Sequence, residues 1–205
     1  MKLYYATGAC SLASYILLNE AKLPFDAVKV STKEHTTESG ADYYKINPKG
    51  YVPALQLDDG EIVTENVVIH GYIASLAPQA KLAPPPGTRE RLRYDQLAIF
   101  ITTEIHKTYS PLFGPALDDA AKAVFREKLI KRYETIEEML SDGRPYLTGP
   151  DFQTVDAYLF TVTRWAAGAK VDLSKFAKVQ AFQERVAARP AVKAAMLAEG
   201  LIKAA

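Results

Sequence analysis

The sequence predicts a mixed α/β region followed by an all-helical region, and three observations point that way. Strand-like and helix-like segments alternate over residues 1 to about 77. Three successive prolines and a glycine interrupt the chain within residues 81–87. After Thr88 almost every apolar pattern has helical spacing. We therefore expect a first domain over residues 1–80, a linker over residues 81–87 and a helical domain over residues 88–205.

The first region is expected to run β-α-β, then through an irregular stretch, then β-β-α. Pro24 stops the first helix, and Asp59–Gly60 is a tight-turn signal between the last two strands. The expected elements are strands over residues 2–6, 25–30, 52–57 and 62–64, and helices over residues 11–22 and 65–77.

The second region carries apolar residues at helical spacing in four segments. Asp118 or Asp119 is expected to cap the second of them, and Arg189–Pro190 is expected to end the last. The third is apolar on nearly all sides, which is typical of a helix inside a core. The four segments are residues 92–109, 124–140, 156–169 and 176–186.

Composition and charge exclude several classes of protein. Lys and Arg total 25 against 24 Asp and Glu, so the net charge of +1 argues against a basic nucleic-acid surface. Hydrophobic residues make up 48%, as in an ordinary globular protein. The single cysteine, Cys10, rules out an internal disulfide and fits a reducing compartment. No apolar run is as long as a membrane span, so we expect a cytoplasmic protein that binds neither membranes nor nucleic acid.

Cys10 stands between the first strand and the first helix. A thiol at a helix N-terminus is close to free N–H groups and the positive end of the helix dipole, which favour the reactive thiolate. The alternative is a small buried hydrophobic residue. Ser11, next along the chain, is a candidate hydrogen-bond donor to a sulfur.

Two further segments have a functional and a structural interpretation. Val52–Pro53 stands at a strand start, either as an ordinary trans proline or as a cis proline that turns the Val52 backbone toward an extended peptide. Glu65 and Asn66 follow the predicted hairpin at a helix start, either as a simple cap or as groups that hold a ligand ammonium and carboxylate.

The histidines do not indicate a metal site. His35, His70 and His106 are far apart in the sequence and have no companion ligand motif, so we expect no metal. His106 and Lys107, on the long helix after the linker, are taken by themselves as surface residues.

Taken together, these segments resemble the beta class of bacterial glutathione S-transferases, and the resemblance covers the whole chain. The segments that carry it, in order, are LYYATGACSLASYILLNEA, INPKGYVPALQLDDGEIVTEN, EIHKTYSPLFGPA, DAYLFTVTRWA and LAEGLIK.

The resemblance implies a thioredoxin-like first domain, an all-helical second domain and a homodimer. It implies glutathione as co-substrate, with no permanently bound cofactor, and a small hydrophobic electrophile as second substrate. Cys10 would lie near the glutathione sulfur. The other implied glutathione contacts are His35, Val52, Pro53, Glu65, Asn66, Thr103 and His106.

Further roles follow from the same resemblance. His106 joins Cys10 as a catalytic residue, and Tyr109 and Lys107 are expected at the electrophile site. Phe113 and Trp165 are possible wall residues for which core packing is preferred. The implied reaction is conjugation of the glutathione thiolate, with peroxidase or thiol–disulfide exchange through Cys10. The alternative is a non-catalytic binder of glutathione or hydrophobic ligands on the same fold.

Three positions depart from the family pattern. His35 replaces a lysine that contacts the glycyl end, where Lys33 is a substitute, and Ile99 replaces an asparagine that reaches across the dimer. Gln153 replaces a Ser or Thr cap, so Thr154 is expected to cap the core helix instead.

Overall fold

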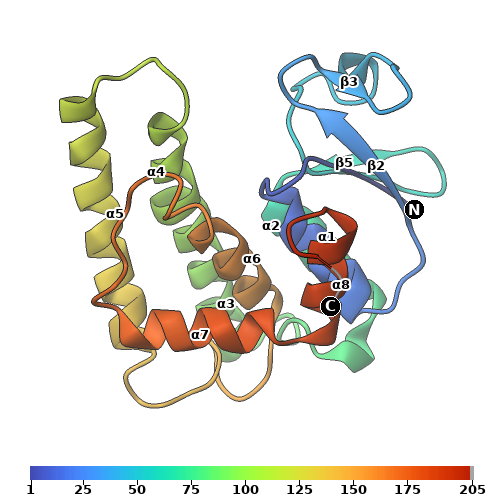
Figure 1. The fold of residues 1–205 in the computed structure, drawn as a ribbon. Coiled ribbons are helices and arrows are strands. Elements are labelled where there is room, and N and C mark those ends of the chain that lie inside the picture. Colours follow the sequence, from blue (N-terminus) through green and yellow to red (C-terminus); the bar gives the residue numbers. More distant parts are fainter. Residues whose placement is uncertain (204–205) are drawn as a thin grey trace. The chain divides into compact units, whose positions relative to one another are not determined.

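The computed structural model describes residues 1–203 and divides into two compact units (Figure 1). The first comprises Met1–Leu82 and the C-terminal segment from Ala188 onward, and the second comprises Ala83–Ala187. The first holds the sheet and the second is helical, as the sequence predicts. The assignment of residues 88–205 to one domain stays a prediction. In the structure the last helix packs in the first unit.

The first unit contains a five-stranded sheet of order β3-β2-β1-β4-β5. β1 is parallel to β2 and antiparallel to β4, and the β4–β5 hairpin pairs Ala54 with Thr64. The two-residue β3 pairs with β2 and was not predicted. The strands are β1 (Lys2–Tyr5), β2 (Asp26–Ser31), β3 (Thr36–Thr37), β4 (Ala54–Gln56) and β5 (Ile62–Thr64).

Three α-helices pack in this unit, and α1 contacts both α2 and α8. The preceding helix ends before Arg189–Pro190, as predicted, and Pro190 also opens the helix α8, which was not predicted. Proline suits a first helical position, where its missing N–H costs nothing. The elements are α1 (Ser11–Glu20), α2 (Asn66–Leu76), α8 (Pro190–Ala198) and 3₁₀ turns at Tyr43–Lys45 and Pro78–Ala80.

Polar contacts fix the C-terminal segment to the first unit. The Gly8 N–H donates to Glu199 Oε2 at 2.7 Å. Arg189 binds both carboxylate oxygens of Glu20, at 2.6 and 2.9 Å. Glu199 is 5% exposed, so its carboxylate holds the turn before Cys10 from inside the unit.

The second unit is built from helices. Its elements are α3 (Arg89–Phe100), a π-helical turn (Ile101–His106), α4 (Lys107–Tyr109), a 3₁₀ turn (Ser110–Leu112), α5 (Asp119–Met139), α6 (Thr154–Thr163) and α7 (Ala177–Ala187). Asp118 caps α5 by accepting from the Ala121 N–H at 2.8 Å, as predicted. In the π turn the Lys107 N–H reaches back to the Thr102 carbonyl, which shifts the side chains that follow.

The core helix α6 lies entirely within the interior, as its apolar pattern predicts. Its start corrects the expectation for Thr154. Gln153 is the N-cap residue, and the Asp156 carboxylate accepts from the Gln153 N–H at 2.7 Å. The Thr154 hydroxyl instead bonds to the Tyr94 hydroxyl. Asp156 therefore supplies the reciprocal contact of a capping box at this helix start.

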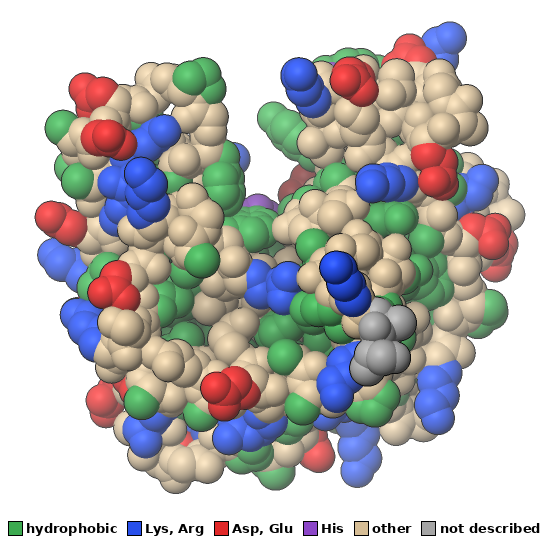
Figure 2. Space-filling model, viewed as in Figure 1, with side chains coloured by type: hydrophobic (Ala, Val, Ile, Leu, Met, Phe, Trp, Pro, Cys, Tyr) green, Lys and Arg blue, Asp and Glu red, His purple; other side chains and the backbone are tan. Residues whose placement is uncertain are grey.

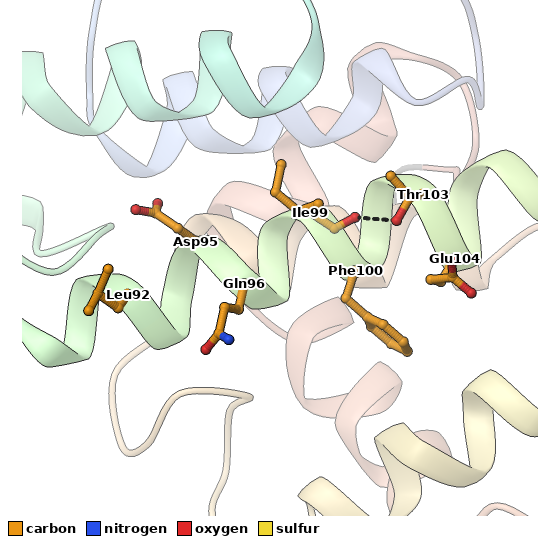
Figure 3. A pocket seen from close by; sticks show the side chains of 7 residues that line it. All are labelled: Leu92, Asp95, Gln96, Ile99, Phe100, Thr103 and Glu104. Atoms are coloured by element: carbon orange, nitrogen blue, oxygen red, sulfur yellow. Dashed lines mark hydrogen bonds between the residues drawn. The ribbon is translucent and has the colours of Figure 1, made fainter.

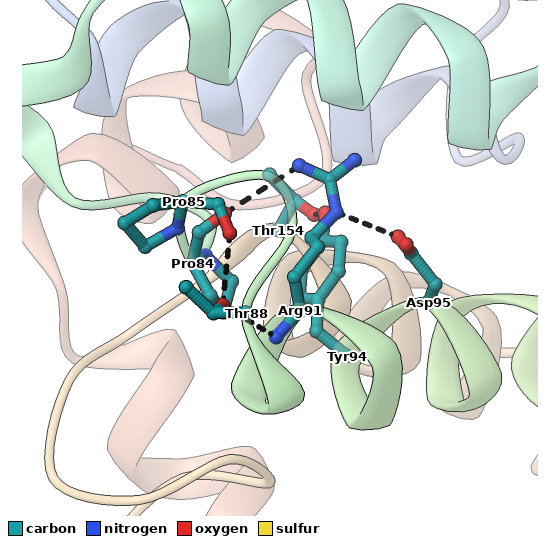
Figure 4. A network of polar contacts seen from close by, with 7 residues as sticks. All are labelled: Pro84, Pro85, Thr88, Arg91, Tyr94, Asp95 and Thr154. Carbon is teal, nitrogen blue, oxygen red and sulfur yellow. Dashed lines mark hydrogen bonds and ion pairs between the residues drawn. The ribbon is translucent and has the colours of Figure 1, made fainter.

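A polar network joins the proline-rich segment to the start of α3 (Figure 4). Thr88 caps α3 by accepting from the Arg91 N–H at 3.1 Å and donates to the Pro85 carbonyl at 2.9 Å. Arg91 pairs with Asp95 at 2.8 Å and lies over the Tyr94 ring. These contacts set where the first long helix begins.

Acidic and basic side chains are interspersed on the face of each unit that Figure 2 shows, as the balanced charge predicts. Along residues 1–203, every helix is too short or too polar to cross a membrane.

Candidate glutathione site

Cys10 is the residue immediately before α1; the residue as a whole is partly exposed, and its sulfur is surrounded by protein. Its Sγ donates a hydrogen bond to the Val52 carbonyl at 3.2 Å. Ser11 is fully buried, and its hydroxyl accepts from the Ala6 N–H at 3.1 Å. The Ser11 hydroxyl therefore closes the turn, while the Ser11 backbone N–H lies close enough to the Cys10 sulfur to lower the pKa of that thiol.

Burial raises the pKa of the Cys10 thiol to about 11. A hydrogen bond from Asn66 and the N–H groups at the helix start lower the pKa, and the Glu65 charge raises it. The expected depression of this pKa is wrong, because desolvation outweighs the helix N-terminus. In this structure Cys10 is a thiol at neutral pH.

The Val52–Pro53 peptide bond is cis, which is the second of the two geometries that the sequence left open. Two polar side chains hold the backbone of Tyr51, the residue before Val52. Both the Tyr43 hydroxyl and the Asn47 amide donate to the Tyr51 carbonyl at 2.8 Å. Tyr43 and Asn47 are buried, so they fix the backbone that leads to Val52.

Glu65 and Asn66 lie where β5 ends and α2 begins. Glu65 has a φ of 72° and its side chain does not cap the helix, so simple capping is the wrong interpretation for it. Its carboxylate lies 2.8 Å from the Lys49 ammonium. Asn66 is buried, and its Oδ1 has no hydrogen-bond partner among the described residues.

His35 packs on the segment between Tyr43 and Val52. Its ring stacks on Tyr44 with centroids 4.3 Å apart. A Cβ at Gly50 would lie 2.9 Å from the His35 ring and 2.8 Å from Tyr44. Gly50 has a φ of +69°, so both backbone geometry and space require glycine there.

His106 lies at the end of the π turn in the second unit. Its Nδ1 is 2.6 Å from the Tyr158 hydroxyl. Burial, assisted by the charge of Lys107, lowers the pKa of His106 to about 4. His106 is therefore neutral at pH 7, so it cannot favour a thiolate through a positive charge. Thr103 and Lys107, on the same segment, are exposed.

An aromatic cluster centred on Trp165 includes His106 in this unit. The Trp165 ring lies 5.0 Å from His106, 5.6 Å from Tyr109 and 5.7 Å from Phe113. Tyr109 is fully buried and bonds through its hydroxyl to Tyr133 at 2.9 Å, which corrects its placement at an electrophile site. Phe113 is 49% exposed, so core packing is the wrong interpretation for it.

A groove runs along α3 and the π turn (Figure 3). Leu92 and Ile99 are 65% and 53% exposed on this helix. The Thr103 hydroxyl donates to the Ile99 carbonyl at 3.0 Å, so it bonds within its own helix. The groove is lined by Leu92, Asp95, Gln96, Ile99, Phe100, Thr103 and Glu104.

Comparison with known proteins decides the family. Residues 8–76 match "Glutathione S-transferase, N-terminal domain", and residues 104–196 match "Glutathione S-transferase, C-terminal domain". The chain belongs to the glutathione S-transferase family. The curated "Glutathione S-transferase GstA" of Escherichia coli O157:H7 is 42% identical over 98% of this chain and 100% of its own length.

Solved glutathione S-transferases agree with this assignment. A "Bacterial beta class" enzyme from Sphingomonas chungbukensis is 42% identical with a TM-score of 0.94. A sphingomonad enzyme "complexed with glutathione" is 41% identical with a TM-score of 0.93. Both alignments cover 98% of this chain and 100% of the other. The beta-class resemblance, the thioredoxin-like and helical fold class, and the transferase prediction are confirmed.

Sequence reasoning missed three residues of the first unit that structure the site. Lys49 pairs with Glu65, and Tyr43 and Asn47 hold the backbone before Val52. The part of the sequence that carries two of these residues is the Asn47–Pro48–Lys49–Gly50 run, which lies in the stretch that we expected to be irregular. Its turn residues give no indication of a partner at Glu65, because that pairing depends on the fold of the sheet.

Proposed function

We propose that this glutathione transferase binds glutathione along the first unit, between Cys10 and Glu65. One observation carries the proposal: the Cys10 sulfur and the Val52 carbonyl lie 3.2 Å apart, on the same unit as the exposed carboxylate of Glu65. Val52 and Pro53 would face the cysteinyl part and Glu65 the γ-glutamyl ammonium. Asn66 would also contact the γ-glutamyl end of glutathione, and His35 would contact its glycyl end.

Cys10 acts in this proposal as a hydrogen-bond donor to the glutathione thiolate, to which its single S–H turns from the Val52 carbonyl. Its high pKa keeps the proton on its own sulfur at neutral pH, and a thiol is a donor whereas a thiolate is not. A donated hydrogen bond stabilises the glutathione thiolate and lowers the pKa of that thiol. The bound thiolate then attacks a small hydrophobic electrophile.

His106 is the proposed catalytic residue of the second unit, as a neutral imidazole. Thr103 is proposed to contact glutathione, and Lys107 with Phe113 to serve the electrophile. Phe113 replaces Tyr109 in this role because it is exposed whereas Tyr109 is buried. We also propose a cytoplasmic homodimer that uses the exposed apolar residues Leu92 and Ile99 of α3.

Two substitutions of Cys10 distinguish conjugation from disulfide exchange. Cys10→Ser keeps a donor and Cys10→Ala removes it, so conjugation to an aryl halide should be retained better by Ser than by Ala. Disulfide exchange needs the sulfur itself, so both variants should lose it. Equal conjugation by wild type, Cys10→Ser and Cys10→Ala would contradict the donor role. A panel of electrophiles, hydroperoxides and mixed disulfides then identifies the main reaction.

A further inference from the structure

Lys49 and Glu65 form an ion pair of opposite charges at one end of the proposed glutathione site. The Lys49 ammonium lies 2.8 Å from Glu65 Oε1 and 3.2 Å from the Thr64 hydroxyl. Both side chains are more than half exposed, at 54% and 67%. An exposed pair of this kind contributes little stability, so a ligand can open it at low cost.

The position of Lys49 is set by the loop that carries it. Asn47 Oδ1 accepts from the Lys49 N–H at 3.2 Å, and the Gly50 N–H donates to the Asn47 carbonyl at 2.8 Å. Asn47 is 2% exposed and also holds the Tyr51 carbonyl. The loop backbone is therefore fixed on both sides of Lys49, and only the side chain is left to move.

The opposite charges of Lys49 and Glu65 are complementary to a zwitterionic ligand group. A ligand ammonium that approached Glu65 alone would also approach the Lys49 charge and be repelled by it. A ligand that carries an ammonium and a carboxylate on the same carbon gives each protein charge an opposite partner. The amino-acid end of a γ-glutamyl compound has this pair of charges.

We propose that Lys49 binds the α-carboxylate of the γ-glutamyl group, beside the ammonium that Glu65 binds, and so selects ligands that carry both charges. This inference rests on the proposed function, because it uses Glu65 as the ammonium site. Lys49 is a binding and specificity residue here and takes no part in the chemical step.

Calorimetry with three ligands tests the proposal. The ligands are glutathione, 4-aminobutyryl-cysteinylglycine, which lacks the α-carboxylate, and glutaryl-cysteinylglycine, which lacks the α-ammonium. Lys49→Met should bind glutathione about fivefold more weakly than wild type, as expected for one exposed charge pair. It should bind the ligand without the carboxylate as tightly as wild type does, or more tightly. Lys49→Arg should keep most of the affinity.

Lys45→Met is the matched control, because Lys45 is an exposed lysine of the neighbouring turn, and its affinities should equal those of wild type. Unchanged or tighter glutathione binding by Lys49→Met would overturn the proposal and make Lys49 only a competitor for Glu65. An equal loss for glutathione and for the ligand without the carboxylate would overturn it too. Failure of the proposed function looks different: wild type does not bind glutathione, or Glu65→Gln binds it unchanged.

Discussion

The Cys10 thiol donates a hydrogen bond to the Val52 carbonyl oxygen at 3.2 Å, across 42 positions of the chain. This contact joins the start of α1 to the residue before the cis proline. A carbonyl favours the protonated sulfur, because a thiolate has no proton to donate. The geometry and the raised pKa therefore agree that Cys10 keeps its proton.

Alkylation of Cys10 should reflect its pKa of about 11. At pH 7.5 in the absence of added glutathione, iodoacetamide should react more slowly with Cys10 than with a model thiol, because the thiolate is the reactive form. The rate should still be rising above pH 9. Asn66→Ala should raise the midpoint further, because the Asn66 hydrogen bond lowers this pKa. A midpoint at or below about 8.5 would show that burial does not dominate.

Glutathione affinity should depend on the charge of Glu65. Glu65→Gln keeps the shape of the side chain and removes its charge. We expect a loss of about 1.5 kcal/mol, or roughly tenfold in Kd, at the low end for a charged hydrogen bond because the group is largely exposed. Calorimetry measures it, with Glu61→Gln on the same hairpin as control. Equal affinities for the two variants would remove Glu65 from the site.

The free energy of unfolding should fall as the pH falls below about 6.5. His70 is 2% exposed, and burial lowers its pKa from 6.5 to about 3. Between those pH values the unfolded chain binds a proton that the folded chain does not. The free energy of unfolding therefore decreases as the pH falls. His70→Gln cannot titrate, and its slope of unfolding free energy against pH should be shallower by up to about 1.4 kcal/mol per pH unit. Parallel curves from denaturant titrations of the two proteins would refute this.

Gly50→Ala should damage the loop that carries Lys49. Its Cβ would meet Tyr44 and His35 at 2.8–2.9 Å, in addition to the cost of a φ of +69°. Gly60→Ala is the matched control, because Gly60 has a φ of +94° and open space around it. Both variants should lose about 1 kcal/mol from the backbone, and Gly50→Ala should lose more. Its glutathione affinity should also fall. If the two variants unfold at the same denaturant concentration, the ring contacts do not matter.

Removal of the α3 cap should destabilise the second unit. Thr88→Ala loses the bond to the Arg91 N–H, and we expect a cost of about 1 kcal/mol. Thr135→Ala removes an exposed hydroxyl within α5 that bonds only to the Lys131 carbonyl, so it should be nearly neutral, because alanine favours helices. Thermal unfolding of both variants measures the difference. Equal midpoints would mean that the network around Arg91 holds the helix start without Thr88.

Elements with strong local signals were predictable from the sequence. The end of the first helix before Pro24, the hairpin around Asp59–Gly60 and the cap at Asp118 follow from residue patterns alone. The two-residue strand β3 has no pattern of its own and exists because β2 offers it a partner. The π turn that ends at His106 could not be predicted, because a single shifted backbone hydrogen bond leaves no pattern in the residue types.

The chemistry of the proposed site was less predictable than the place of its residues in the fold. Cys10, Val52 and Glu65 were identified by position, but whether Cys10 keeps its proton depends on how deeply the folded chain buries the sulfur. The helix start favours the thiolate and burial opposes it, and only the packed structure shows which is larger. The neutral state of His106 has the same origin.

The hydrogen bond from Gly8 to Glu199 orders events during synthesis, because these residues are 191 positions apart. At about 5–20 residues per second, a ribosome needs roughly 10–40 s to travel from one to the other. The sheet and α1 emerge first, yet their turn gains its carboxylate partner only after the whole helical unit has been made. The loop that leads to Cys10 is thus completed last, so a nascent chain that stalls before Glu199 lacks the carboxylate that anchors this loop.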